Sequence, residues 1–379
     1  MEIYFDNAAT TVVYPEVREL CMTLMAEDFG NPSSMHIKGV DAEEYVKASA
    51  LQMARALKCR DKELVFTSGG TESNNMAIIG SALAKRRKGK HIITTAIEHA
   101  SVSSPLSFLE KEGYEVTRIP CGSDGRVNVE DVAAAVREDT ILVTIMLVNN
   151  EVGSVQPVKE IAKAVKAIRE DIYVHTDAVQ AFGKIRTDVR ELNVDLLSIS
   201  GHKLHGPKGS GALFVKEGTL LRPIIYGGGQ QRDMRSGTEN VPAIAGMGLA
   251  AEKMTNALDE NTNKMLAVKN TLSEGFSRLD GVTLHSGDAP HIVSASFTGV
   301  RSEVMLHSLE DKGIYVSAGS ACSTNKPHVS ETLKSMGLSK EELDSTIRFS
   351  FSELNTEEEA RYTVDTVSEL LPMLRRFKR

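Results

Sequence analysis

The chain has 379 residues, of which 41% are hydrophobic and 25% charged, as in an ordinary globular protein. Its formal net charge of −7 argues against nucleic acid as a direct ligand. The sequence shows no signal peptide and no apolar run long enough for a membrane helix, so we expect a cytoplasmic protein that does not bind membranes. The four cysteines lack zinc or redox spacing and are expected to be free thiols.

Strand-like and helix-like segments alternate over the first two thirds of the chain. Apolar runs predict strands at ELVFT, HIITTAIEH, YEVTRIP, TILVTIMLV, IYVHTDA, DLLSISGH and GALFV, in that order. The intervals leave room for amphipathic helices such as KEIAKAVKAIRED. This alternation predicts an α/β fold with a mainly parallel sheet flanked by helices. The basic run KRRKGK, residues 85–90, follows a helical pattern and is interpreted as a helix C-terminus.

The pattern changes near residue 257. A long helical stretch is followed by VTLHS, HIVSASF, IYVSAG and TIRFSF, which predict strands of a smaller sheet. Thr356 and Glu359 have the spacing of a capping box that opens a final helix. We therefore expect a large domain over residues 14–257 and a smaller α+β domain made of residues 1–13 and 258–379.

A glycine-rich turn, FTSGGTESNN at residues 66–75, joins a predicted strand to a predicted helix. Free backbone N–H groups and the helix dipole make such a turn a candidate phosphate site. The alternative is an ordinary capped helix with Thr71 or Ser73 as its N-cap. P-loop and dinucleotide fingerprints are both missing here.

Asp177 follows an apolar run in VHTDAVQAFG, at the expected carboxyl end of a strand, where open α/β sheets bind ligands. Its carboxylate can hold a cationic ring nitrogen, and Gln180, three residues later, can reach a neighbouring oxygen. The alternative is a carboxylate that caps the next helix.

Lys203 lies in SISGHKLHGPKGSG, a turn rich in glycine that follows another predicted strand. A lysine held on a rigid turn suits a Schiff base with a carbonyl. Two alternatives are a metal site formed by His202 and His205 and a solvated loop lysine. Together, the phosphate turn, the strand-end Asp177 and Lys203 match the requirements of pyridoxal phosphate.

Cys322 lies in VSAGSACSTNKPH, among small, polar and turn-forming residues. A buried structural thiol would be expected among larger apolar neighbours. The segment therefore leaves two interpretations, an incidental loop cysteine and a nucleophile carried on a flexible arm.

The motifs above, with YFDNAATT, FGNPSS, EHAS, NNEVG, RSGTEN, SAGSAC and IRFS, cover the chain from end to end. With them the chain resembles the cysteine desulfurases, a branch of the class-V aminotransferase-like enzymes. The resemblance implies a fold-type I pyridoxal phosphate enzyme that is a homodimer. It implies no metal.

The resemblance also implies a role for each matching residue. Lys203 would bind the cofactor covalently, Asp177 its ring nitrogen and Gln180 its ring oxygen, and His99 would stack on the ring and help to move protons. The phosphate would be held by Gly70, Thr71, Ser200, His202 and, from the neighbouring subunit, Thr238. Asn150, which also lies in the expected cofactor site, and Arg348 would bind the substrate carboxylate, although Arg348 alone could equally form a structural ion pair.

The implied reaction removes sulfur from L-cysteine, releases alanine and leaves a persulfide on Cys322. The persulfide would pass to an acceptor protein for iron–sulfur cluster assembly or for thiolation of tRNA or a cofactor. Small residues before Cys322 give the arm the freedom that such delivery needs. The alternatives are a selenocysteine lyase, an ordinary aminotransferase and a non-catalytic sulfur-relay scaffold.

Overall fold

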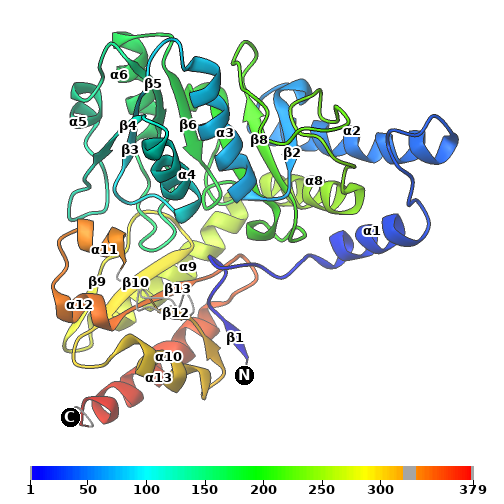
Figure 1. Cartoon of the computed structure of the whole chain (residues 1–379). Coiled ribbons are helices and arrows are strands. Elements are labelled where there is room, and N and C mark those ends of the chain that lie inside the picture. The colour runs from blue at the N-terminus through cyan, green and yellow to red at the C-terminus, as the bar shows by residue number, and fades with distance from the viewer. Residues whose placement is uncertain (1, 319–329, 377–379) are drawn as a thin grey trace.

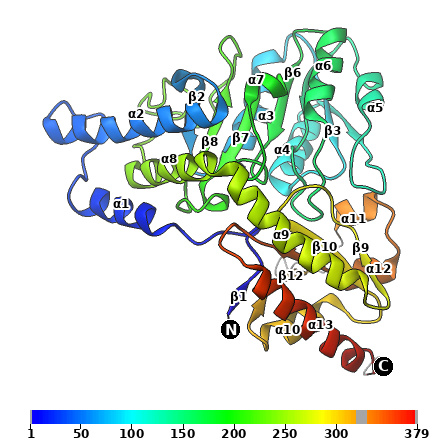
Figure 2. The same ribbon diagram turned by 180° about the vertical axis from the view of Figure 1, so that it is seen from behind.

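The computed structural model describes residues 2–318 and 330–376, and Figures 1 and 2 show it from opposite sides. Its largest sheet has seven strands in the order β2-β8-β7-β6-β5-β3-β4. Their bounds are β2 Leu64–Thr67, β3 His91–Thr95, β4 Glu115–Ile119, β5 Thr140–Thr144, β6 Tyr173–Asp177, β7 Leu196–Ser200 and β8 Gly211–Val215. Only β8 runs antiparallel to its neighbours. The prediction of a mainly parallel sheet is therefore confirmed.

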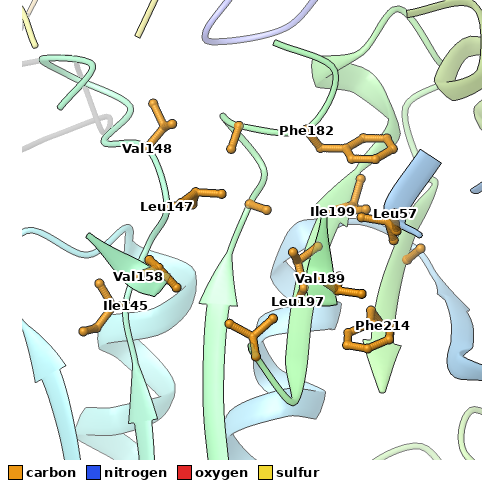
Figure 3. Close-up of a cluster of buried hydrophobic side chains, with 14 of the residues drawn as sticks. Leu57, Ile145, Leu147, Val148, Val158, Phe182, Val189, Leu197, Ile199 and Phe214 are labelled. Carbon is orange, nitrogen blue, oxygen red and sulfur yellow. The ribbon is translucent and has the colours of Figure 1, made fainter. Parts of the chain in front are cut away.

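Helices cover both faces of this sheet. One face carries α3 (Gly70–Lys85) and α4 (Ala100–Lys111), which bury Ile78 and Leu106 against β3 and β5. The other carries α2 (Ile37–Leu57), α6 (Val158–Ile168), α7 (Val189–Leu192) and α8 (Val241–Asn256), and Figure 3 shows part of their shared core. Consecutive β7 residues alternate between the faces, since Leu196 packs beside α3 and Leu197 lies in the opposite core. Burial on both faces explains why the central strands, such as β5 and β7, are rich in apolar residues.

The remaining helices of the large-sheet region lie at its margins. They are α1 (Pro15–Ala26) and α5 (Val129–Ala134), with a short 3-10 turn, η1, at Asp61–Glu63. The basic run 85–90 falls where α3 ends at Lys85 and β3 begins at His91, as predicted. In both views α1 and the first turns of α2 stand away from the sheet.

A second core surrounds a four-stranded sheet of order β12-β13-β10-β9. Its strands are β9 Val282–Leu284, β10 Ile292–Phe297, β12 Ser317–Ala318 and β13 Thr346–Ser350. The helices of this region are α9 Leu258–Ser277, α10 Ser302–Glu310, α11 Glu331–Ser335, α12 Lys340–Ser345 and α13 Glu357–Arg376. Phe276 of α9 packs against Phe297 and Phe349, with ring centroids 5.4 and 5.0 Å away. The division into two domains stays a prediction.

Two local predictions about this region have different outcomes. The capping box is present, because the N–H of Thr356 donates to Glu359 at 2.8 Å and the N–H of Glu359 donates back to Thr356 Oγ1 at 3.2 Å. The segment IYVSAG, in contrast, is not one strand of the small sheet. Its first part is β11 (Ile314–Tyr315), which pairs in parallel with β1 (Ile3–Tyr4), and its second part is β12. β11 pairs with the amino-terminal strand and does not join the four-stranded sheet. The alternation of apolar and polar residues within a segment does not reveal which strand it pairs with.

Among residues 2–318 and 330–376, no helix combines the length and apolar character needed to cross a bilayer.

Candidate active site

A cavity of about 310 Å³ opens at the carboxyl ends of β6 and β7, where they meet the amino-terminal segment and β13. Open α/β sheets bind ligands at this edge. Most of the predicted site residues line it: Gly70, Thr71, His99, Asn150, Asp177, Gln180, Ser200, His202, Lys203 and Arg348. Segments far apart in the sequence thus converge on one site.

Lys203 ends a single 3-10 turn, η2 (Gly201–Lys203), that directly follows β7. Its amine donates hydrogen bonds to the carbonyl oxygens of Ala8 and Ala9, the latter at 2.7 Å. Burial, helped by the positive charges of Arg348 and Lys184, lowers the pKa of Lys203 to about 7. A substantial fraction of the amine is therefore uncharged at neutral pH, as a nucleophile or a base requires. The amine is thus held against the amino-terminal segment at the wall of the cavity.

Asp177 is the last residue of β6, and its side chain is buried. Oδ1 accepts the N–H of Val179 at 2.9 Å, and Oδ2 accepts Nδ2 of Asn74 at 2.7 Å. The first contact closes a turn and does not cap a helix, because the next helix begins only at Val189, and the carboxylate also faces the cavity. Burial raises the pKa of Asp177, and a cationic partner in the cavity would favour its ionised form.

His99 is the N-cap of α4, and its Nδ1 accepts the N–H of Ser101 at 3.1 Å. The Ser101 hydroxyl lies 2.8 Å from the same nitrogen and also 2.8 Å from Nδ2 of Asn74. Burial lowers the pKa of His99, which favours an uncharged imidazole. Asn74 and Ser101 therefore connect His99 to Asp177 through side-chain hydrogen bonds.

The glycine-rich turn leads into α3 without a side-chain cap. Its N-cap is Gly69, so the expectation of Thr71 or Ser73 is wrong. Thr71 is already the second helical residue, and the Ser73 hydroxyl lies 2.8 Å from that of Thr67. Within the described residues, the N–H groups of Gly70 and Thr71 have no hydrogen-bond acceptor. Backbone donors of this kind form anion sites.

Gly70 also leaves space that a larger residue would fill. A Cβ atom at Gly70 would lie 2.7 Å from Cγ2 of Val179, which itself lines the cavity. A larger residue at position 70 would therefore displace Val179, which lies in the turn after Asp177.

Arg348 of β13 enters the cavity wall with its guanidinium already held at two points. Nη1 donates to the carbonyl oxygen of Asn150 and Nη2 pairs with Asp6, both at 2.8 Å. The structural ion pair considered from the sequence is thus present. Nε, however, is buried without a partner among the described residues, so the guanidinium retains donor capacity for a ligand.

Two candidate residues do not line this cavity. Thr238 lines a separate, smaller cavity beside Gln231 and Arg235. His205 does not join His202 in a metal site, since its Nδ1 lies 2.7 Å from the carbonyl oxygen of Val12. In the described part of the chain no group of three or more metal-binding side chains converges. Cys322 lies outside the described residues.

The residues of the cavity fit pyridoxal phosphate. Free N–H groups at the start of α3 suit its phosphate, buried Asp177 suits a cationic ring nitrogen, and the amine of Lys203 suits its aldehyde. Gln180 also lines the wall, where its Nε2 donates to the carbonyl oxygen of Ala8 at 2.9 Å and its Oε1 is buried without a partner among the described residues. Together these groups satisfy the requirements deduced from the sequence.

Comparison with known proteins identifies the family. The model of the class-V aminotransferases matches residues 3–362 of the chain. The chain belongs to this family. It is 42% identical over 376 residues to the cysteine desulfurase IscS of Methanosarcina thermophila, an alignment that covers 98% of the chain and 93% of that protein.

Solved structures of similar proteins support the same family. A NifS-like protein superposes with a TM-score of 0.93 at 37% identity, covering 99% of this chain and 100% of the other. A structure described as SspA in complex with cysteine gives a TM-score of 0.82 at 35% identity, with coverage of 93% and 99%. The predicted family and fold class are therefore confirmed, and enzymes of this family use pyridoxal phosphate.

The sequence interpretation missed several residues that build the site. Asn74 and Ser101 join Asp177 to His99, and Asp6 holds Arg348. A signal existed for Asn74, since it lies four residues after Gly70 and therefore on the same face of α3. No local pattern connects Asp6 with Arg348, because 342 residues separate them.

Proposed function

We propose that this protein is a pyridoxal phosphate-dependent cysteine desulfurase that converts L-cysteine to L-alanine and retains the sulfur as a persulfide on Cys322. Atoms and electrons balance without another reactant, because the thiol of Cys322 and cysteine together give the persulfide and alanine. The proposal is supported by the relatives at about 40% identity over the full chain and by the arrangement of the cavity.

The observation that carries the proposal is where the segment containing Cys322 begins and ends. On one side, Ser317 of β12 is the register partner of Arg348, which lines the cavity. On the other side, Ser330 caps α11 and its hydroxyl donates to Glu151, next to Asn150. The main chain of Asn150 is itself bonded to Arg348. Both ends therefore lie at the same edge of the cavity.

The length of chain available is compatible with the reaction. Cys322 is the fourth residue after Ala318, and extended chain spans about 3.5 Å per residue, so its Cα atom can lie up to roughly 14 Å from that of Ala318. An ordinary aminotransferase has no need of a cysteine at this place, whereas sulfur transfer does.

The residues of this chain divide the work. Arg348 and Asn150 would bind the substrate carboxylate, and the amine of Lys203, uncharged near neutral pH, would take the proton from the α-carbon. When bound, pyridoxal phosphate supplies a carbonyl for the substrate amine and an electron-withdrawing ring. Asp177 would hold the ring nitrogen and Gly70 and Thr71 the phosphate. The thiolate of Cys322 would then attack the γ-sulfur as its bond to carbon breaks.

The deciding experiment is mass spectrometry of the peptide containing Cys322 after incubation with L-cysteine, together with measurement of alanine. We expect one added sulfur atom on that peptide, and Cys322→Ser should abolish sulfide release in the presence of a reducing agent. A keto acid in place of alanine, or full sulfide release by Cys322→Ser, would contradict the proposal.

The partners and the compartment are parts of the same proposal. The persulfide would be passed to an acceptor protein of iron–sulfur assembly or of tRNA or cofactor thiolation, and the enzyme would act in the cytoplasm. Incubating the persulfide-bearing protein with candidate acceptors and following the label from ³⁵S-cysteine would identify the acceptor.

An exposed apolar surface supports a homodimer. Met35 is 99% and Phe29 69% exposed, and they belong to a group on α1, the following loop and the start of α2: Met22, Met25, Phe29, Met35, Ile37 and Val40. This is the part of the molecule that stands away from the sheet in Figure 1. Monomeric proteins rarely expose contiguous apolar patches of this kind, and methionine and phenylalanine are enriched in interfaces.

A further inference from the structure

Lys184 is a buried lysine that the reaction described above does not use. It follows Gly183 in the loop after β6 and is only 1% exposed. Its Nζ donates to the main-chain carbonyl oxygen of Lys203 at 2.8 Å. Within the described residues, no carboxylate lies within ion-pair distance of Lys184. Burying an ammonium group without a carboxylate in direct contact destabilises the fold, so we looked for a role for this residue.

The contact completes the support of the Lys203 turn. The amino-terminal segment holds one side of this turn, because the N–H and the hydroxyl of Thr11 both donate to the carbonyl oxygen of His202 at 2.9 Å. The hydroxyl also accepts the N–H of His205 at 2.8 Å. None of these bonds reaches the main chain of Lys203 itself. Among the described residues, Lys184 is the side chain that does.

The charges around Lys203 give the contact a second effect. Arg348 and Lys184 lower its pKa, after burial, while Asp6 and Asp177 oppose them. The pKa values of the nearby imidazoles, His99, His202 and His291, are lowered mainly by burial, so they add little positive charge near neutral pH.

Lys184 is itself a buried amine. Burial lowers its pKa to about 8, against the favourable charge of Glu353. The positive charge that Lys184 carries disfavours protonation of Lys203, whose pKa is lowered to about 7.

We propose that Lys184 is a positioning residue for Lys203, which fixes the main-chain carbonyl of Lys203 and, by like-charge repulsion, keeps its amine available in the uncharged form. The inference deepens the proposed function. It rests on that function only in assigning the uncharged amine of Lys203 a role as nucleophile or base. The contact and the charge can be tested without any turnover.

The test follows the reactivity of Lys203 in the cofactor-free protein. Brief exposure to isotope-coded acetic anhydride at a series of pH values, followed by mass spectrometry of the Lys203 peptide, gives the pH at which the amine is half reactive. We expect about pH 7 for the unaltered protein, in line with the pKa of Lys203. Lys184→Met removes the charge and the hydrogen bond with little change in length, and should lower the labelling rate at pH 7 about tenfold.

Two further variants separate the charge from general effects. Lys184→Arg keeps a positive charge and a donor, and should leave the half-reactive pH close to that of the unaltered protein. Lys269→Met is the matched control, because Lys269 is a partly buried lysine whose pKa is also lowered to about 8, and it donates to the carbonyl oxygens of Gly287 and Ala289 instead. This control should leave the reactivity of Lys203 unchanged.

The outcomes are distinct. An unchanged labelling profile in Lys184→Met, or an equal shift in Lys269→Met, would overturn the inference. If circular dichroism shows that Lys184→Met does not fold, Lys184→Gln removes the charge with a polar side chain and must show the same loss of reactivity. Failure of the proposed function would appear instead as missing alanine and persulfide, with the labelling results unaffected.

Discussion

Replacement of Arg348 by lysine separates substrate binding from the structural ion pair. Arginine has five N–H donors, of which one is used by the carbonyl oxygen of Asn150 and one by Asp6, leaving three that include the unpartnered Nε. An ammonium group has three donors, so the same two contacts would leave one. A substrate carboxylate that is held by two hydrogen bonds would therefore lose one of them.

The expected effect follows from the strength of that bond. A hydrogen bond to a charged group contributes about 1.5–3 kcal/mol, which corresponds to a roughly 10- to 150-fold increase in KM for L-cysteine at 1.4 kcal/mol per factor of ten. Because the lost bond is present in both bound substrate and transition state, kcat should change much less. The assay is the rate of alanine formation over a range of cysteine concentrations.

Arg375→Lys is the control for this experiment. Arg375 also donates to two main-chain carbonyl groups, of Thr298 and Gly281, but it lies on α13 away from the cavity. It should alter thermal stability at most. An unchanged KM in Arg348→Lys, with a lower melting temperature, would show that Arg348 serves only the ion pair with Asp6 and would refute the reasoning.

Three other predictions follow from the site and the surface. The rate of covalent binding of pyridoxal phosphate to the cofactor-free protein can be followed by visible absorbance. This rate should rise about tenfold between pH 6 and pH 8 and then level off, because the pKa of Lys203 is about 7. A rate that still rises tenfold per pH unit above pH 8 would contradict this prediction. Gly70→Val should weaken retention of pyridoxal phosphate at least about tenfold through its clash with Val179, measured by dialysis, and unchanged retention would show that the turn can adjust. The double variant Met25→Glu and Phe29→Glu should prevent formation of the proposed homodimer and sediment as a monomer, and an unaffected dimer would place the interface elsewhere.

The pH dependence of the free energy of unfolding gives a separate test of the lowered pKa of Lys203. The pKa of Lys203 falls from 10.5 in an unfolded chain to about 7, so between these values the unfolded state binds more protons. The free energy of unfolding of the cofactor-free protein should therefore rise from pH 7 towards pH 10 by this contribution, as Lys184 also predicts. Urea unfolding at several pH values would measure the slope.

Much of the fold could be predicted because it depends on local patterns. The central strands of the large sheet are rich in apolar residues, and the capping box at Thr356 needs only a spacing of three residues. The strand ends then placed Asp177 and Lys203 at the same edge of the sheet. These features follow from elementary rules of strand burial and chain direction.

The errors and omissions concern contacts between distant segments. Ile314 and Tyr315 have the alternation of a strand, but their partner is the amino-terminal strand. Asn74 reaches Asp177 across 103 residues, and the polar character of Lys184 in an apolar stretch gave no indication of its partner. Pairing across such distances is decided by the packed fold and cannot be read from periodicity.

The contact between Asp6 and Arg348 has a consequence for biosynthesis. At a ribosomal rate of about 5–20 residues per second, the 342 residues between them take roughly 17–70 s to synthesise. Throughout this interval the emerging polypeptide cannot complete the wall that would hold the substrate carboxylate. Turnover of L-cysteine by a newly made polypeptide would therefore report that translation has passed the last strand, and prematurely terminated products should remain inactive.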